Sequence, residues 1–388
     1  MEKPEPESIE TFVERYVDEL AAAGAIRSAG VERAFRRVQR HRLLETFSHR
    51  TAEGSTTVHH DPERPRREHL ALIYAATALA TRQADGLPVS STSLPSLMAE
   101  MLELLELGQG MAVLEIGAGT GYNAALIAEI VGDQRLVTTV DIVPDVVEQT
   151  RRLLAGAGYP DIQVRLGDGF EGVAGAASFD RIVATVGCSD LSPHWAAQLA
   201  DDGVMLIPLS HAGAHPLVLL RKDHGELRGR VVQWTGFIPV RGPLYIEDLW
   251  PYGVIAAAPA EIVRESVPSP RFATGGPDGS LGLSEEETGF LFYLGLNDRR
   301  AYWTPEGPGL SDGRSGWATL ARDGISWWKD ELLARRLDHY YQDWDARGRP
   351  LAGDYLVSFA PIEEERDPPP GGWVIERRFY RELVTLGA

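Results

Sequence analysis

Three glycines stand at alternate positions in "AVLEIGAGTGYNAALIAEIVG", residues 112–132. Glycine adopts positive φ angles readily, and its lack of a side chain lets a ligand approach the backbone. The apolar run before Gly117 predicts a buried strand, and the residues after Gly121 predict a helix. In open α/β sheets, ligands bind at such a turn, beyond the carboxyl end of the strand. The pattern therefore indicates a small-molecule site.

The spacing of the glycines distinguishes between ligands. A dinucleotide site needs G-x-G-x-x-G, but Tyr122 stands where the third glycine would be, and the Gly-Lys-Ser/Thr of a phosphate-binding loop is absent. An acid, Glu115, lies two positions before Gly117. The resulting E-x-G-x-G-x-G resembles the first motif of class I methyltransferases, and this resemblance implies S-adenosylmethionine as the cofactor.

Two further acids follow strand-like segments. Asp141 ends "LVTTVDI", at about the separation at which an acid binds ribose hydroxyls, and the resemblance implies that Asp168 in "LGDG" lies near adenine. Each also has a structural interpretation, Asp141 at a helix N-terminus and Asp168 in a turn. The residues expected to bind the cofactor are Glu115, Gly117, Ala118, Gly119, Thr120, Gly121, Tyr122, Asn123, Asp141, Ile142, Gly167, Asp168 and Gly169.

A narrower resemblance covers residues 31–242. The segments "VERAFRRVQRHRLLE", "SSTSLPSLMAEMLELL", "LEIGAGTGYNAALIAEIVG", "FDRIVATVG", "ADDGVMLIPL" and "FIPV" occur in the order found in protein-L-isoaspartate O-methyltransferases. The match places Ser93 on the family's active-site serine and Pro95 on the proline that follows it. It implies transfer of a methyl group to a carboxylate.

The chain also departs from that family. Where the repair enzymes have Thr-Ile-Ser, it carries Ser90, Ser91, Thr92 and Ser93, and a tryptophan-rich segment, 243–388, follows the matched region. Both features resemble an actinobacterial branch associated with ribosomally made modified peptides such as lanthipeptides and graspetides. That branch implies methylation of an ordinary aspartate in a peptide, followed by closure to an aspartimide.

The expected catalytic groups are the hydroxyls of Ser93, Ser91 and Thr92. A carboxylate is ionised at neutral pH and needs no strong base, so neutral hydroxyl donors suffice to orient it. The serines could instead cap the helix that follows. The expected partner is a peptide or protein that presents an aspartate carboxylate. Three alternatives stay open: isoaspartate repair, a non-catalytic module that binds S-adenosylmethionine and recruits a partner, and methylation of a small-molecule carboxylate.

The hydrophobic patterning predicts an α/β fold of the class I methyltransferase (Rossmann-like) type. Helices are expected over 8–23, from Ser28, and over 93–107, with a loop over 51–68. Short apolar runs then alternate with helical segments, which predicts a doubly wound parallel sheet with helices on both faces and an antiparallel addition near 215–240. The expected domains are an N-terminal helical region, 1–65, the methyltransferase domain, 66–242, and an extra C-terminal α+β domain, 243–388.

The C-terminal segment carries seven of the nine tryptophans. A helix is expected over 326–344 and a last strand over 373–380. The aromatic residues of this part are expected to form a core, with a peptide-docking surface as the alternative. They include Trp327, Trp328, Tyr340, Tyr341 and Trp344.

Composition limits the partners and the setting. The net charge of −18 over 388 residues disfavours nucleic acid, and the basic segments 33–42 and 62–69 are expected to be solvated. The single cysteine, Cys188, an N-terminus unlike a signal peptide and the lack of a membrane-length apolar run favour the cytoplasm, with no membrane. Adjacent His59 and His60 lack ligand-spaced partners, so no metal is expected and both are assigned to a loop.

Overall fold

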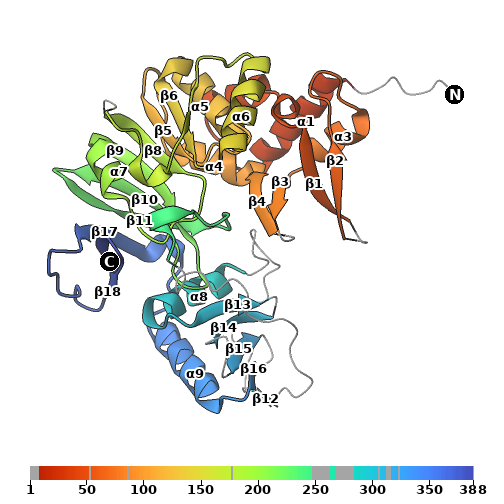
Figure 1. Ribbon diagram of the computed structural model, residues 1–388. Coiled ribbons are helices and arrows are strands. Elements are labelled where there is room, and N and C mark those ends of the chain that lie inside the picture. The colour runs from red at the N-terminus through yellow and green to blue at the C-terminus, as the bar shows by residue number, and fades with distance from the viewer. Residues whose placement is uncertain are drawn as a thin grey trace. The chain divides into compact units, whose positions relative to one another are not determined.

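The computed structural model describes residues 8–51, 54–84, 87–175, 178–246, 263–266, 284–304, 306–311, 316–321 and 324–387. The chain forms two compact units (Figure 1). The first comprises Met1–Thr185 and Ala197–Leu206, and the second comprises Val186–Ala196 and Ile207–Ala388. The two compact units are divided near residue 185, at the end of a strand. The boundary expected at residue 242 was based instead on a change in amino-acid composition.

A parallel sheet forms the centre of the first unit. Its strands lie in the order β9-β8-β5-β6-β7, and every neighbouring pair is parallel, as the sequence predicts. The helices α5 and α6 pack on β6 and β7 (Figure 1). The bounds are β5 Val113–Ile116, α5 Tyr122–Val131, β6 Val137–Asp141, α6 Pro144–Gly156, β7 Gln163–Leu166, β8 Phe179–Ala184, α7 Pro193–Gln198 and β9 Leu199–Pro208.

The helix after the glycine turn is apolar on nearly all sides. Only Asn123 and Glu129 of α5 are less than fully buried. The cause is packing on two sides, because α5 contacts both β6 and the N-terminal helix α2, Ala29–Arg37. The Phe35 ring meets the Tyr122 ring edge-on with centroids 6.1 Å apart. The N-terminal helices therefore complete the core around the expected cofactor turn.

The N-terminal helices begin where the sequence predicts. Ser8 caps α1, Ile9–Ala22, by accepting a hydrogen bond from the Thr11 amide, and Ser28 caps α2 by accepting one from the Val31 amide. After α2 come a short 3-10 helix, η1 at Arg40–Leu43, then α3 at Arg67–Ile73 and α4 at Pro95–Leu104.

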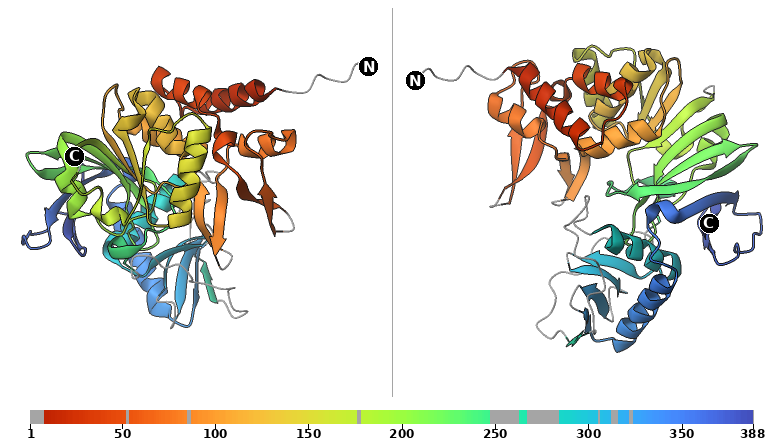
Figure 2. Two further views of the ribbon diagram at one scale, coloured as in Figure 1. Left: turned by 45° about the horizontal axis from the view of Figure 1, so that its top comes forward. Right: turned by 180° about the vertical axis from the view of Figure 1, so that it is seen from behind.

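The loop expected over 51–68 is wrong for its first part. Residues Gly54–His59 form β2, which pairs antiparallel with β1, Thr46–Thr51. Together with β3, Leu79–Ala84, and β4, Leu87–Thr92, they make a four-stranded sheet in the order β2-β1-β3-β4. Figure 2 shows these strands extending away from α1 and α3. Ser55, Thr56 and Thr57 are exposed, so the hairpin carries no apolar alternation that would have predicted it.

The second unit contains two antiparallel arrangements. In one, β10, Pro216–Asp223, pairs with β11, Glu226–Trp234, as predicted for the antiparallel addition, and the C-terminal strands join them in the order β11-β17-β19-β18. In the other, five strands lie in the order β12-β16-β15-β14-β13. The remaining bounds are η4 Gly242–Leu244, β12 Val263–Ser266, α8 Glu285–Asn297, β13 Ala301–Thr304, β14 Gly307–Ser311, β15 Trp317–Ala321, β16 Gly324–Trp328, α9 Glu331–Ala346, η6 Ala352–Asp354, β17 Tyr355–Pro361, β18 Trp373–Glu376 and β19 Tyr380–Leu386.

The helix expected over 326–344 begins later than predicted. Ser326–Trp328 belong to β16, and α9 starts after Asp330, whose side chain caps it by accepting from the Leu332 amide. The last strand expected over 373–380 is likewise interrupted, because residues 377–379 form the turn between β18 and β19. Tyr341 and Trp344 are buried in the core of the second unit, and Trp327 and Tyr340 pack against it, so the core interpretation of these aromatics is confirmed.

A buried arginine holds the turn between β18 and β19 in the second unit. Arg377 forms an ion pair with Glu382 and donates to the carbonyls of Ser189 and Ser210. Burial opposes ionisation of Glu382, yet the Arg377 guanidinium and His211 keep the pKa of this carboxyl at about 2. The C-terminal strands are thereby fixed to the segment that holds Cys188, which is itself buried.

Of the two histidines assigned to a loop, His59 instead ends β2, whereas His60 follows that strand in a loop, as expected. His60 is buried and lies in a chain of polar groups with His41, His69 and Tyr74. Its Nε2 donates to the His41 carbonyl at 3.0 Å, its Nδ1 lies 3.4 Å from His69 Nδ1, and His41 Nδ1 lies 2.8 Å from the Tyr74 hydroxyl. Burial lowers the pKa of His41 to about 4 and also lowers the pKa of His60. The rings of His41 and His60 are therefore neutral at physiological pH.

We expect acid to destabilise the first unit through this cluster. Because the folded-state pKa of His41 lies below its ordinary value of 6.5, the unfolded chain takes up more protons between these two pH values. The stabilisation is complete above the ordinary pKa and is lost as pH falls toward the folded one, on the order of 2 kcal/mol by about pH 5. Hydrogen exchange at amides of residues 40–74, measured at about pH 7.5 and about pH 5, will show the loss.

His41→Gln should flatten this dependence on pH. His224→Gln is the matched control, because the His224 side chain is 98% exposed. Equal slopes in His41→Gln and the wild-type protein would contradict the assignment.

Candidate functional site

The glycine turn has the conformation that its sequence predicts. Gly117, Gly119 and Gly121 have φ angles of 100°, 52° and 82°, and Gly121 is the N-cap of α5. A Cβ on Gly121 would lie 2.8 Å from Leu154 Cγ of α6. A Cβ on Gly119 would lie 3.2 Å from the Ser91 carbonyl oxygen. The turn thus packs against both α6 and the end of β4, and a side chain at either position would separate them.

Polar side chains fix the backbone of this turn from several elements. Asp141 Oδ2 accepts from the amides of Ala118 and Gly119 at 3.2 and 3.4 Å. Thr150 of α6 donates to the Gly119 carbonyl at 2.8 Å. Thr185, which follows β8, donates to the Gly117 carbonyl at 2.8 Å. The two threonines were not predicted, because each is contributed by a distant segment and has no motif of its own.

Glu115 is a buried acid that precedes the turn by two residues. It is 1% exposed, and its burial raises the pKa of the carboxyl to about 7. Asn123 donates to Oε1 at 2.7 Å. Among the described residues, neither Glu115 Oε2 nor Asn123 Oδ1 has a donor within normal hydrogen-bond distance, although the Thr139 hydroxyl, opposite Glu115 on β6, is near enough to lower the pKa of the carboxyl. Two buried acceptors beside the turn therefore lack a close donor.

The acids expected after the second and third strands also lie at the carboxyl edge of the sheet. Asp141 pairs in register with Leu166, and the Gly167 amide donates to the Asp141 carbonyl at 3.1 Å. Asp168 caps the 3-10 helix η3, Gly169–Glu171, by accepting from the Phe170 amide at 2.9 Å.

Apolar side chains stand next to these acids. Ile142 and Leu166 are 39% and 53% exposed, an unusual position for large aliphatic residues. Leu166 was missed by the sequence analysis, because only the register of β6 and β7 places it opposite Asp141.

The four hydroxyls around β4 have different surroundings. Ser91 and Ser93 are half-buried, whereas Thr92 is 3% exposed and its Oγ1 lies 3.5 Å from Arg40 Nη2. Ser90 Oγ accepts a hydrogen bond from Thr81 of the neighbouring strand at 3.0 Å. The structure therefore brings Ser91 against the glycine turn and directs the Thr92 hydroxyl to Arg40.

Arg40 corrects the expectation that the basic segment 33–42 is solvated. Its side chain is completely buried, whereas Arg36 and Arg37 of the same segment are exposed. The sequence offers no sign of the difference, because an arginine that ends a helical segment is usually solvated.

No group of His, Cys, Asp and Glu side chains in the described part of the chain could hold a metal ion. Nor is any described helix long and apolar enough to cross a bilayer.

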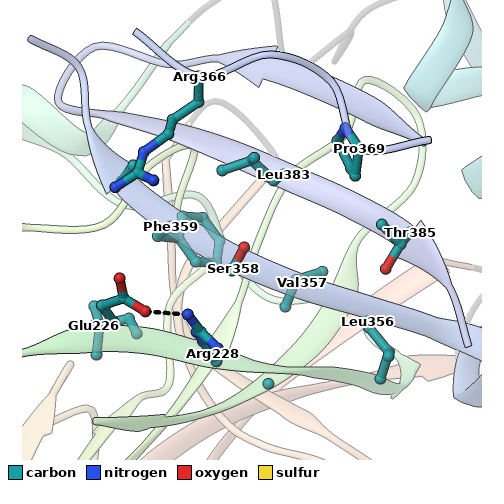
Figure 3. A pocket seen from close by; sticks show the side chains of 13 residues that line it. Glu226, Arg228, Leu356, Val357, Ser358, Phe359, Arg366, Pro369, Leu383 and Thr385 are labelled. Atoms are coloured by element: carbon teal, nitrogen blue, oxygen red, sulfur yellow. Dashed lines mark hydrogen bonds and ion pairs between the residues drawn. The ribbon is translucent and has the colours of Figure 1, made fainter. Parts of the chain in front are cut away.

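A hollow of about 420 Å³ lies over β11, β17 and β19 in the second unit (Figure 3). Arg228, Leu356 and Pro369 are among its lining residues, and none of the predicted site residues is.

The parallel sheet, the glycine turn and the acids after successive strands define a class I methyltransferase fold. The model of the family "Protein-L-isoaspartate(D-aspartate) O-methyltransferase (PCMT)" matches residues 63–244. The chain is 32% identical to the protein-L-isoaspartate O-methyltransferase of Pyrococcus horikoshii over 232 residues, which are 59% of this chain and 92% of that protein. It is 35% identical to protein-L-isoaspartate O-methyltransferase 2 of Archaeoglobus fulgidus over 150 residues, which are 39% and 68% of the two chains.

A solved structure of a protein-L-isoaspartate O-methyltransferase aligns with a TM-score of 0.54 at 22% identity and covers 89% of this chain and 96% of its own. The chain belongs to the protein-L-isoaspartate O-methyltransferase family. Members of this family are S-adenosylmethionine-dependent carboxyl methyltransferases that act on protein or peptide substrates.

The residues around the turn fit this cofactor. S-adenosylmethionine carries an ammonium group and a sulfonium, and the buried acceptors of Glu115 and Asn123 that lack a close donor suit a cationic ligand.

We expect the affinity for S-adenosylmethionine to rise with pH through about 7. The free protein holds Glu115 mainly protonated below that value, and a cationic ligand favours the ionised carboxylate, so binding should release a proton. Calorimetric titrations in two buffers of different ionisation enthalpy will detect the release.

Glu115→Gln should bind the cofactor without the proton release and without the pH dependence. Glu14→Gln, an equal change of charge at an exposed position of α1, is the control. Binding heats of the wild-type protein that do not depend on the buffer would refute the role of Glu115.

Proposed function

We propose that this protein transfers a methyl group from S-adenosylmethionine to the side-chain carboxylate of an aspartate in a peptide. The observation that carries the proposal is the packing of Gly119 against the Ser91 carbonyl, since a Cβ at Gly119 would lie 3.2 Å from that oxygen. This contact brings the glycine turn, which we assign to the methyl donor, directly beside the end of β4, where the hydroxyl groups lie. The reaction needs such proximity, because alignment of nucleophile and methyl group is the main catalytic requirement.

The residues at and around the glycine turn bind the cofactor. S-adenosylmethionine, when bound, supplies an electrophilic methyl group. Glu115 and Asn123 attract its cationic part, and the backbone of the glycine turn contacts its body. Asp141 and Asp168 would accept hydrogen bonds from its nucleoside, and Ile142 would contribute an apolar contact. The contributing residues are Glu115, Gly117–Asn123, Asp141, Ile142 and Gly167–Gly169.

The hydroxyls act on the acceptor. Ser93, with Ser91, donates hydrogen bonds to one carboxylate oxygen and so turns the other toward the methyl group. Neutral donors suit the task, because the carboxylate loses its charge in the transition state and a cation would stabilise the ground state more. The Thr92 hydroxyl, which faces Arg40, orders this segment.

We further propose that the natural acceptor is an ordinary aspartate in a modified ribosomal peptide. The run of hydroxyls from Ser90 to Ser93 and the C-terminal addition support this proposal by their resemblance to the peptide-modifying branch. The methyl ester is a good electrophile. The backbone nitrogen of the next residue attacks its carbonyl carbon, methanol leaves, and an aspartimide forms without a further catalyst.

Isoaspartate repair is the second candidate function. Membership of the protein-L-isoaspartate O-methyltransferase family favours it. The C-terminal addition does not argue against it, because a solved structure of a protein-L-isoaspartate O-methyltransferase aligns with 89% of this chain.

The two candidates predict different acceptors. With purified protein and radiolabelled S-adenosylmethionine, the proposal expects methanol release and loss of water from a cyclised ribosomal peptide that contains normal aspartate. Repair expects methylation of an isoaspartyl peptide and none of its aspartyl counterpart. Exclusive use of the isoaspartyl peptide would overturn the ribosomal-peptide assignment.

We expect Ser93→Ala to lower kcat roughly 10- to 100-fold, the value of a lost hydrogen bond to a charged group. The affinity for S-adenosylhomocysteine should not change, because Ser93 lies on the acceptor side. Ser90→Ala is the matched control, since its hydroxyl bonds to Thr81 on the neighbouring strand. A kcat of Ser93→Ala equal to that of Ser90→Ala would remove Ser93 from the mechanism.

A further inference from the structure

Arg40 is a completely buried cation whose partners are mostly neutral backbone groups. Nη1 donates to the carbonyls of Ile73 and Ala75 at 2.7 and 3.5 Å. Nη2 donates to the Thr77 carbonyl at 3.1 Å and the Ser93 carbonyl at 3.2 Å, and it lies 3.5 Å from Thr92 Oγ1. Within the described part of the chain it forms no ion pair with a carboxylate, although burial of an unpaired charge is costly. Retention of such a residue calls for a function.

The guanidinium joins three segments that are far apart in the sequence. Its own segment is η1, the carbonyls of Ile73, Ala75 and Thr77 belong to the end of α3 and the turn after it, and Thr92 and Ser93 form the junction between β4 and α4. The planar, fork-shaped group can hold several carbonyls at fixed directions, which the point charge of lysine cannot do. Arg40 therefore holds the backbone carbonyl of Ser93, the residue whose hydroxyl is assigned to the acceptor.

Arg40 also touches the cofactor side. Its Cζ lies 5.9 Å from the centroid of the Tyr122 ring, and Tyr122 directly follows the last glycine of the turn. The Tyr122 hydroxyl lies 3.4 Å from that of Tyr16, and both rings are buried. The Arg40 guanidinium thus lies close to Tyr122, which follows the glycine turn, and also contacts the end of β4, against which that turn packs.

We propose that Arg40 is a positioning residue for methyl transfer, which fixes the Thr92–Ser93 backbone and couples it to the glycine turn through the Tyr122 ring. This inference rests on the proposed function, because it gives Ser93 a role toward the acceptor. Arg40 itself touches no reacting atom. Its effect is on the alignment of acceptor and donor, where a shift of about 1 Å can cost about 100-fold in rate.

The test compares Arg40→Lys with Arg42→Lys. Arg42 lies in the same 3-10 helix, but its guanidinium pairs with Glu63 and the Gly156 carbonyl at the surface. The number of competent sites is counted by titration with S-adenosylhomocysteine, and kcat is expressed per competent site. Arg40→Lys should lower kcat by roughly 10- to 100-fold, with the affinity for S-adenosylhomocysteine changed less than about 3-fold. Arg42→Lys should leave kcat unchanged.

A structural role alone would reduce the number of competent sites and leave kcat per site at the wild-type value, and this outcome would overturn the inference. Thr92→Val serves where Arg40→Lys fails to fold, because it removes one acceptor of Arg40 with little change of shape. It should lower kcat in the same direction and speed hydrogen exchange in residues 92–94, and unchanged exchange and kcat would count against Arg40.

The inference and the proposed function fail in different ways. If the wild-type protein binds S-adenosylmethionine but methylates neither aspartyl nor isoaspartyl peptides, the proposed function is wrong. The exchange rates at residues 92–94 in Arg40→Lys then decide whether Arg40 fixes this segment. If the wild-type protein is active and Arg40→Lys is equally active per site, only the inference is wrong.

Discussion

The close approach of the glycine turn to the end of β4 is the constraint on which the rest of the site depends. At Gly119 the φ angle is 52° and the Ser91 carbonyl lies within 3.2 Å of the position a Cβ would take. Both conditions favour glycine, and the contact joins a turn of the parallel sheet to a strand of a separate four-stranded sheet. The four-stranded sheet that precedes the parallel sheet in the chain thus forms part of the surroundings of the glycine turn, because it contains β4.

Two ionisable side chains, Glu115 and Arg40, are buried on either side of this contact. Glu115 lies beside the turn, where burial raises the pKa of its carboxyl although Asn123 donates a hydrogen bond to it. Arg40 lies beneath Thr92 and Ser93, where carbonyl oxygens occupy its terminal nitrogens. Desolvation makes both groups costly to bury, and such groups are concentrated at functional sites. Glu115 is placed to respond to a ligand, whereas Arg40 is placed to hold backbone.

The sequence predicted the parallel sheet, the turn and the first two helices, because each has a strong local signal. Alternating strands and helices specify parallel pairing, and Ser8 and Ser28 are residues that cap helices. Local signals failed where tertiary contacts decide the outcome. The exposed hairpin at Gly54–His59 has no apolar alternation, and Ser326–Trp328 resemble the start of a helix but pair as β16 with β15. His59 was assigned to a loop but ends β2, and contacts with His41 and His69 bury the loop residue His60.

For the site, the sequence by itself indicated the family and predicted the cofactor-binding residues, because glycine spacing and acids at successive strand ends are local requirements of the chemistry. Only the tertiary structure decided how the hydroxyls differ. Register and packing put Ser91 against Gly119 and turned Thr92 toward Arg40, and these contacts join segments about 30 and 50 residues apart in the chain. It also brought in Leu166, Thr150 and Thr185, which no motif marks. A motif records what one turn needs, whereas the neighbours of that turn depend on how distant strands and helices pack.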